Sequence, residues 1–187
     1  PNAVVILSNG SDTKVGSTFA PWERFGDWKR IDNEAEPGVI SLETAIRGVC
    51  EPRRLLDLVE NFIRYLDRPG GLVKVLAQNH QVLGVNAAME ALQSVQTRKG
   101  RLGVFWHTQG SGKSLSMLFF TQKVLRREPG NWTFVLVTDR TELDDQLYGE
   151  FKDAGAVEGH VQATSSANLR ELLGQDHRYV FSLIHKF

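Results

Sequence analysis

The spacing of apolar and polar residues changes near Gly71, so the chain has two parts. In the first part the apolar run AVVIL, residues 3–7, ends at the turn sequence SNG, which predicts a buried strand closed by a turn. The segment TKVGST, residues 13–18, is placed to be its hairpin partner. An aromatic and basic segment at 20–31 and a break at 33–38 follow.

Two helices are predicted before Gly71. Ser41 is placed to cap a short helix, and Pro52 stands where a second helix would start. In the second helix apolar residues recur every three or four positions from Leu55 to Leu66, which predicts one apolar face. The sequence DRPGG, residues 67–71, ends this helix and is the expected domain boundary.

After Gly71 strands alternate with helices. The pattern predicts helices at 85–95 and 114–127, two more beginning at Thr141 and near Ser166, and strands at 101–106, 132–137 and 178–184. Asp144 stands three residues after Thr141, which indicates a capping box at the start of that helix. Alternating strands and helices favour an α/β fold with a parallel sheet.

Composition is typical of a globular protein. The 187 residues are 41% hydrophobic and 24% charged, enough for one or two compact domains. The 22 basic residues balance the 22 acidic ones, which gives no global attraction to nucleic acid but leaves room for a local basic face. A single cysteine, Cys50, excludes an internal disulfide and favours a cytoplasmic location. No apolar run approaches the roughly 18–20 residues of a membrane span. Because the chain starts with Pro1 and not methionine, we expect it to be part of a longer protein.

The candidate chemistry lies in the loop GSGKS, Gly110 to Ser114, which matches the G-K-[ST] end of the phosphate-binding loop. Glycines at 110 and 112 let backbone N–H groups turn toward phosphate oxygens, where a Cβ would obstruct them. The loop opens a helix, whose positive end faces the same phosphates. Lys113 would bring a positive charge to the β- and γ-phosphates, and Ser114 would offer its hydroxyl to Mg²⁺.

One position departs from this pattern. The full motif has a glycine five residues before Gly112, and this chain has His107 there. The alternative to nucleotide binding is a glycine-rich turn between strand and helix that carries an unrelated lysine. The predicted strand before the loop, the helix after it and the lysine in register together favour nucleotide binding.

The surroundings of this loop resemble a known family. The segments WHTQGSGKSLSM, FVLVTDRTELDDQL, VQATSSANLRELL and YVFSLIHKF are similar to the first motor domain of the R subunit of type I restriction endonucleases, which are superfamily 2 DNA translocases fused to a nuclease. The earlier segments VVILSNGSDTKVGSTFAPWERFGDWKRI and LLDLVENFIRYL resemble the region that joins this nuclease to the motor. The resemblance is most specific from Trp106 to Phe151.

The resemblance implies roles for further residues. NHQVLGVNAAM looks like the glutamine motif of these motors, in which Gln81 would read the adenine edge, since a carboxamide can donate and accept at once. The alternative is a surface glutamine at a helix start. VTDRTELDDQ stands where the family has its first strand-tracking motif, so Thr138 and Arg140 would contact DNA phosphates. The alternative is a turn at Asp139–Arg140 that only caps the next helix. The expected ATP-binding set is Gln81, Thr108, Gln109, Gly110, Ser111, Gly112, Lys113 and Ser114, with Lys113 catalytic.

Several parts of the family's machinery are not found in the sequence. There is no Asp-Glu-x-His or Asp-Glu-Ala-Asp box after Phe134, no arginine finger from a second motor domain, and no nuclease centre before the first strand. Asp144 and Asp145 are interpreted as helix N-terminal charges and not as a metal pair, and the histidines lack zinc-ligand spacing. Trp22 and Trp28 favour a packed aromatic corner over a nucleic-acid contact. We expect the 187 residues alone to bind ATP weakly and neither to hydrolyse it nor to move DNA.

The sequence therefore predicts an α/β protein in three parts. Residues 1–32 would end a nuclease-like domain, 33–71 would form a helical connector, and 72–187 would begin a RecA-like P-loop motor domain with a parallel sheet flanked by helices. The expected function is that of an ATP- and Mg²⁺-dependent R subunit, a type I site-specific deoxyribonuclease. Its expected partners are double-stranded DNA and the methyltransferase and specificity subunits, with no membrane. The alternatives are another superfamily 2 helicase or translocase, or a P-loop protein that binds nucleotide without translocating.

Overall fold

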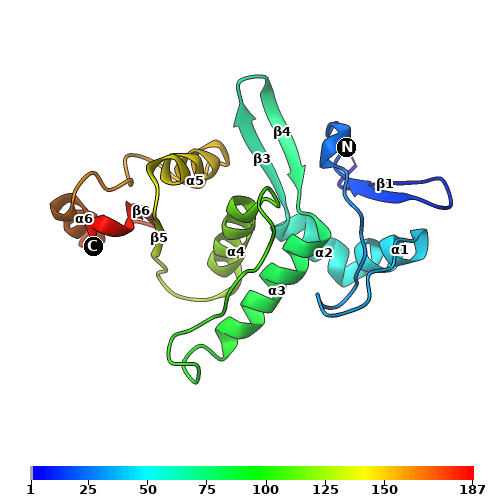
Figure 1. Cartoon of the computed structure of the whole chain (residues 1–187), viewed down its shortest axis with the longest axis horizontal. Helices are drawn as coiled ribbons and strands as arrows, with labels where there is room; N and C mark the ends of the chain where they lie inside the picture. The colour runs from blue at the N-terminus through cyan, green and yellow to red at the C-terminus, as the bar shows by residue number, and fades with distance from the viewer. Residues whose placement is uncertain (1) are drawn as a thin grey trace. The chain divides into compact units, whose positions relative to one another are not determined.

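The structure is a computed structural model that describes residues 2–187 (Figure 1). Its strands are β1 (Val5–Ser8), β2 (Thr13–Gly16), β3 (Ile63–Arg68), β4 (Gly71–Leu76), β5 (Phe134–Thr138) and β6 (Tyr179–Leu183). Its α-helices are α1 (Leu42–Cys50), α2 (Pro52–Asn61), α3 (Asn79–Gln93), α4 (Lys113–Arg127), α5 (Thr141–Asp153) and α6 (Ser166–Leu173). Short 3-10 helices cover Trp22–Arg24 and Ile184–Lys186. The described strands pair in three two-stranded sheets, β1–β2, β3–β4 and β5–β6.

The chain divides into two compact units. The first contains the chain up to Tyr65 together with Val73–Val124, and the second contains Leu66–Leu72 and Leu125–Phe187. The predicted phosphate loop lies in the first unit, and the predicted DNA contacts lie in the second. Within residues 2–187, no helix combines the length and the apolar character that crossing a membrane requires.

The N-terminal hairpin forms as predicted, with β1 antiparallel to β2 and Val5 opposite Gly16. The prediction that its first strand is buried was wrong, because the apolar side chains of β1 are only half-buried and Leu7 is 45% exposed. Burial falls instead on β2, where Val15 is 5% exposed and its backbone also bonds to Gly26. β2 lies between β1 and the bridge at Gly26, whereas β1 pairs with β2 alone among the described strands.

The two predicted helices before Gly71 both start where expected. Ser41 caps α1, because its hydroxyl oxygen accepts a 3.0 Å hydrogen bond from the Thr44 N–H. Pro52 is the first residue of α2. This agrees with proline's preference for the first helical position, where its missing N–H has no intrahelical partner to lose.

The end of the second helix differs from the prediction. The helix stops at Asn61, and Ile63–Arg68 forms β3, so DRPGG lies at the connection between β3 and β4 and does not end a helix. The aromatic and β-branched run FIRYL suits a pleated strand, and Gly71 has a φ of +105°, which favours glycine at the start of β4. Residues 63–66 continue the helical spacing of α2, but pairing with β4 makes them a strand.

The helices α3 and α4 form as the pattern predicts, but the strand predicted between them does not. α3 starts at Asn79, earlier than predicted, and the side chain of Gln81 closes its first turn on the Gln78 N–H. The strand predicted at 101–106 does not form, and Val104 and Trp106 are 85% and 93% exposed. A strand is stable when its backbone groups pair with a neighbour, and no described strand pairs with this segment.

The core of the first unit contains a paired buried charge. The rings of Phe62 and Phe119 meet with centroids 5.8 Å apart, and both side chains are fully buried. Lys123 of α4, 8% exposed, lies over the Phe62 ring and donates to both carboxylate oxygens of Asp57 at 2.7 Å and to Asn86 Oδ1 at 2.7 Å. A buried ammonium needs such partners, and here they connect α2, α3 and α4.

The second unit is built on the parallel pair β5–β6, in which Phe134 lies opposite Tyr179 and Thr138 opposite Leu183. Every residue of β6 is buried, and Phe151 of α5 meets the rings of Tyr179 and Phe181 at 5.1 and 5.4 Å. α6 adds a further apolar cluster of Ala163, Leu169, Leu172 and Val180. These two strands run parallel, but the predicted parallel sheet flanked by helices is not confirmed, because residues 2–187 contain no parallel sheet larger than this pair.

Candidate phosphate-binding site

The predicted phosphate loop immediately precedes α4, which begins at Lys113. Gly110 and Gly112 both have a φ of +78°, a backbone conformation that only glycine adopts without strain. An added Cβ at Gly110 would meet nothing within 4 Å, whereas one at Gly112 would lie 2.7 Å from Gln81 Nε2. The two glycines are therefore required for different reasons: one for conformation only, and the other for conformation and close packing.

Gln81 holds this loop from α3. Its side chain is buried, its Nε2 donates to the Gly112 carbonyl at 2.9 Å, and its Oε1 accepts from the Gln78 N–H at 2.9 Å. The alternative that Gln81 lies at the surface is therefore wrong, since the residue is only 3% exposed. A role for Gln81 in reading adenine stays a prediction.

A pair of histidines supports the same loop. His80 Nε2 donates to the Ser111 carbonyl at 3.0 Å, and its ring meets His107 edge-on with centroids 4.9 Å apart. His107 occupies the place of the motif's first glycine, with its side chain 9% exposed. Its Nε2 donates to Glu34 Oε1 at 2.9 Å. Neither His80 nor Glu34 was predicted as a site residue, because His80 was given no role in the segment NHQVLGVNAAM and Glu34 belongs to no motif found in the sequence.

The side chain of Lys113 folds back over the first residues of the loop. Its Nζ donates to the carbonyl oxygens of His107 at 2.8 Å and Thr108 at 3.0 Å. Thr108, Gln109, Gly110 and Lys113 are exposed, so the loop surface is accessible. The ammonium is placed within the loop by backbone acceptors, where it would meet an incoming phosphate.

The chemistry of the loop residues fits a nucleoside triphosphate and its magnesium ion. The Cβ position of Gly110 is open, and the hydroxyl oxygen of Ser111 is buried without a hydrogen-bond partner among the described residues. Ser114 is half-buried in the first turn of α4. The loop leads directly into the first turn of α4, and the positive end of a helix is a usual place for an anion.

Lys113 and His107 also line a cavity of about 750 Å³ between α3, α4 and residues 102–107. Its other walls are largely apolar, including Ala87, Phe105 and Phe120. The walls also include the donors Arg98 and Ser116 and the carboxylates Glu34 and Glu90, so charged groups of both signs lie beside the loop.

The two predicted DNA contacts have different environments. Thr138 is buried, and its hydroxyl donates to Asp144 Oδ1 at 3.1 Å. The side chain of Arg140 is 77% exposed, with Asp139 3.6 Å away. Arg140 is thus available to an external phosphate, whereas the hydroxyl of Thr138 is engaged within the unit.

The predicted capping box at α5 was wrong. Arg140 is the N-cap residue and makes no side-chain cap bond. Asp144 is 2% exposed and accepts from Thr138 and from Gln162 Nε2, the latter at 2.6 Å. Its carboxylate ties the end of β5 to the chain before α6 instead of capping the helix. Within residues 2–187 no three metal-ligating side chains gather at one place.

Comparison with known proteins places the chain in a family. A model of the SWI2/SNF2 ATPases matches residues 80–187, which include the predicted phosphate loop. The chain is 36% identical over 198 residues to the type I restriction enzyme HindI endonuclease subunit of Haemophilus influenzae, an alignment that covers 100% of this chain and 19% of that protein. It is 37% identical over 157 residues to the type I restriction enzyme SauCOLORF180P endonuclease subunit of Staphylococcus aureus, covering 82% of this chain and 16% of that protein.

The chain spans about a fifth of the length of these relatives. They confirm the resemblance seen in the sequence to the nuclease and motor subunits of type I restriction enzymes. The chain therefore belongs to the SWI2/SNF2 ATPase family, and its relatives are endonuclease subunits of type I restriction enzymes.

Proposed function

We propose that residues 107–114 bind the phosphates of ATP and that this chain is part of the ATP-driven motor of a type I restriction enzyme. The loop geometry carries the proposal, because two glycines at a φ of +78° precede α4 and Lys113 lies over the loop's own carbonyls. The match to an ATPase family favours this function over a P-loop protein of another class, such as a kinase or a regulatory switch.

Each loop residue has a distinct proposed role. Backbone N–H groups from Thr108 to Gly112 surround the β- and γ-phosphates, and Lys113 turns from the His107 and Thr108 carbonyls to the phosphate oxygens. The Ser114 hydroxyl is the proposed protein ligand of Mg²⁺, an ion that neutralises charge on the triphosphate when bound. Gln81 then has two candidate tasks, holding Gly112 and reading the adenine edge.

DNA contact is proposed for Arg140 in the second unit. Its exposed guanidinium at the end of β5 suits a phosphate contact, which positions a protein on DNA without reading its sequence. Thr138 has a more limited proposed part, since its hydroxyl already donates to Asp144. It would orient the turn that presents Arg140, and contact DNA through this turn.

For the whole protein we propose the activity of a type I site-specific deoxyribonuclease that pumps double-stranded DNA with ATP and cuts it. The methyltransferase and specificity subunits are its proposed partners. Residues 1–32 are proposed to end the nuclease domain, 33–71 to connect, and 72–187 to begin the motor. Because residues 2–187 include no acidic magnesium box, the 187 residues by themselves are proposed to bind ATP without hydrolysing it.

Replacement of the loop lysine tests the proposal. In the full-length protein, Lys113→Ala should lower DNA-stimulated ATP hydrolysis by about 10²–10³-fold, the usual effect of removing a donor to developing phosphate charge. ATP hydrolysis is measured by phosphate release with and without duplex DNA. The matched control is Lys152→Ala, an exposed lysine in the last turn of α5, which should leave the rate unchanged. Near-normal turnover by Lys113→Ala would refute the proposed site.

A further inference from the structure

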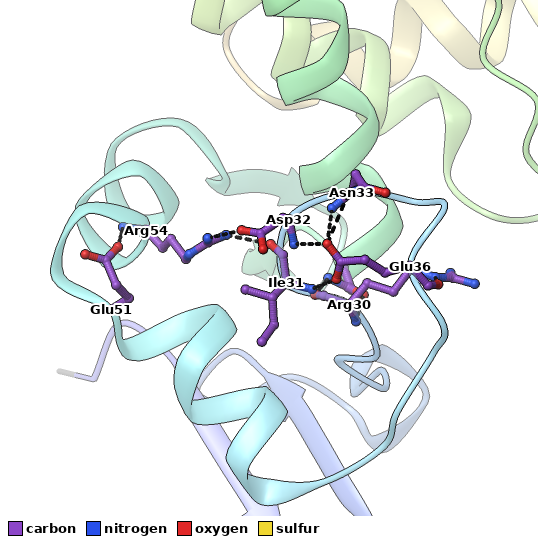
Figure 2. Close-up of polar contacts among 8 residues, drawn as sticks. Arg30, Ile31, Asp32, Asn33, Glu36, Glu51 and Arg54 are labelled. Carbon is purple, nitrogen blue, oxygen red and sulfur yellow. Dashed lines mark hydrogen bonds and ion pairs between the residues drawn. The ribbon is translucent and has the colours of Figure 1, made fainter.

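The segment between the N-terminal hairpin and α1 contains an ordered loop, residues 31–36 (Figure 2). The carboxylate of Glu36 accepts hydrogen bonds from the N–H groups of Ile31 at 3.0 Å, Asp32 at 2.9 Å and Asn33 at 2.9 Å. The Ile31 N–H is the main cause of a Glu36 pKa below its usual range, and the other two donors add to it. The side chain of Glu36 thus closes this loop on itself.

Two side chains from neighbouring helices fix the loop in place. Arg54 of α2 donates to the Ile31 carbonyl and to the Asp32 carboxylate, as Figure 2 shows. Asn79, the first residue of α3, accepts from the Lys29 and Arg30 N–H groups at 3.1 and 3.0 Å and donates to the Arg30 carbonyl at 2.9 Å. The backbone of residues 29–36 is therefore held by both helices and by Glu36.

Residues 29–36, held in this way, form a bracket. The bracket presents Glu34 to the phosphate loop. Glu34 Oε1 accepts from His107 Nε2 at 2.9 Å, although the two residues are 73 positions apart. The His107 ring also meets His80 and Phe105 edge-on, with centroids 4.9 and 5.5 Å away. The carbonyl of the same His107 accepts from Lys113 Nζ. One residue thus links the bracket to the catalytic lysine.

We propose that Glu34 and His107 are a positioning pair for nucleotide binding, an inference that rests on the proposed function of the loop. A glycine at position 107 would leave the start of the loop free, whereas a buried imidazole must be held by a partner. Glu34 supplies that partner, fixes the backbone at His107, and so fixes one of the carbonyls that place Lys113. The N-terminal segment thereby contributes to ATP affinity without touching the nucleotide.

A double-mutant cycle in the full-length protein tests this pair. The dissociation constant of a fluorescent ATP analogue with Mg²⁺ is measured for Glu34→Ala, His107→Ala and the double variant. Each single change should weaken binding about three- to tenfold, which is less than the usual loss for a hydrogen bond to a charged group because Glu34 is 46% exposed. The double variant should bind no more weakly than His107→Ala, because that change has already removed the contact with Glu34.

Two further variants separate positioning from a general effect on folding. Glu34→Gln keeps an acceptor oxygen in the same place and should retain most of the affinity. Glu43→Ala removes an exposed glutamate of α1 that pairs only with Arg47 among the described residues, and should change nothing. Melting temperatures are measured in parallel and should be unchanged for Glu34→Ala, because Glu36, Arg54 and Asn79 hold the bracket.

The outcomes are distinct. Unchanged affinity in Glu34→Ala, additive losses in the double variant, or an unfolded Glu34→Ala protein would each overturn the positioning pair. Equal losses in Glu34→Gln and Glu34→Ala would do so as well. Lys113→Ala serves as the reference, because normal ATP affinity in that variant would refute the proposed function itself and not merely this pair.

Discussion

Replacing Gly112 by alanine should damage the phosphate loop more than the same change at Gly110. Both residues have a φ of +78°, so alanine is strained at either position. Only at Gly112 does the new Cβ collide, 2.7 Å from Gln81 Nε2, while nothing lies within 4 Å of a Cβ at Gly110. Gly110→Ala is therefore a matched control that isolates the contact with Gln81.

The magnitudes follow from these two terms. A left-handed backbone costs a non-glycine residue about 1–2 kcal/mol, which applies to both variants. At Gly112 the methyl group also displaces Gln81 Nε2 from the Gly112 carbonyl, and leaving a buried carboxamide unpaired costs about 1–3 kcal/mol. Gly112→Ala should thus exceed Gly110→Ala by about 1–3 kcal/mol of local stability.

Amide hydrogen exchange of the full-length protein measures this difference locally. Peptides that cover the start of α3 and the phosphate loop should lose more protection in Gly112→Ala than in Gly110→Ala. In a Gln81→Ala background the two glycine variants should become equal, because the colliding atom has been removed. Equal exchange in the original background, or a difference that persists without Gln81, would refute the reasoning.

Three other predictions concern the remaining sites. If Gln81 reads adenine, Gln81→Ala should reduce the preference for ATP over GTP about tenfold in equilibrium binding; equal weakening of both nucleotides would leave only its contact with Gly112. Arg140→Ala should lower the slope of log DNA affinity against log salt concentration by about one, without changing sequence preference, in titrations at several salt concentrations. An unchanged slope would mean that Arg140 serves only in the turn before α5. Because the pKa of Glu36 is lowered by the Ile31 N–H, its contribution to stability is present above the unfolded pKa of about 4.3 and is lost as pH falls through the lower folded pKa. Melting temperatures between pH 3 and 6 should therefore depend less on pH in Glu36→Gln, and identical profiles would contradict this role.

The sequence predicted features whose causes lie within a few residues. Ser41 and Pro52 start their helices because a cap and a proline act on the adjacent turn. Gly110 and Gly112 predict the phosphate loop because positive φ is a property of the single residue. The parallel direction of β5 and β6 agrees with the strand–helix alternation in the sequence, although the pattern did not say which strands would pair.

Only the tertiary structure decided the features that depend on a distant partner. The run from Ile63 to Leu66 carries a helical spacing, yet it became a strand because β4 offers backbone partners. Residues 101–106 carry a strand pattern, and they form no strand because no described strand pairs with them. The same holds for the site, where Gln81 and Glu34 reach the loop across 31 and 73 positions. Hydrogen bonds of that range are formed by packing, and a local pattern contains no record of which segments will meet.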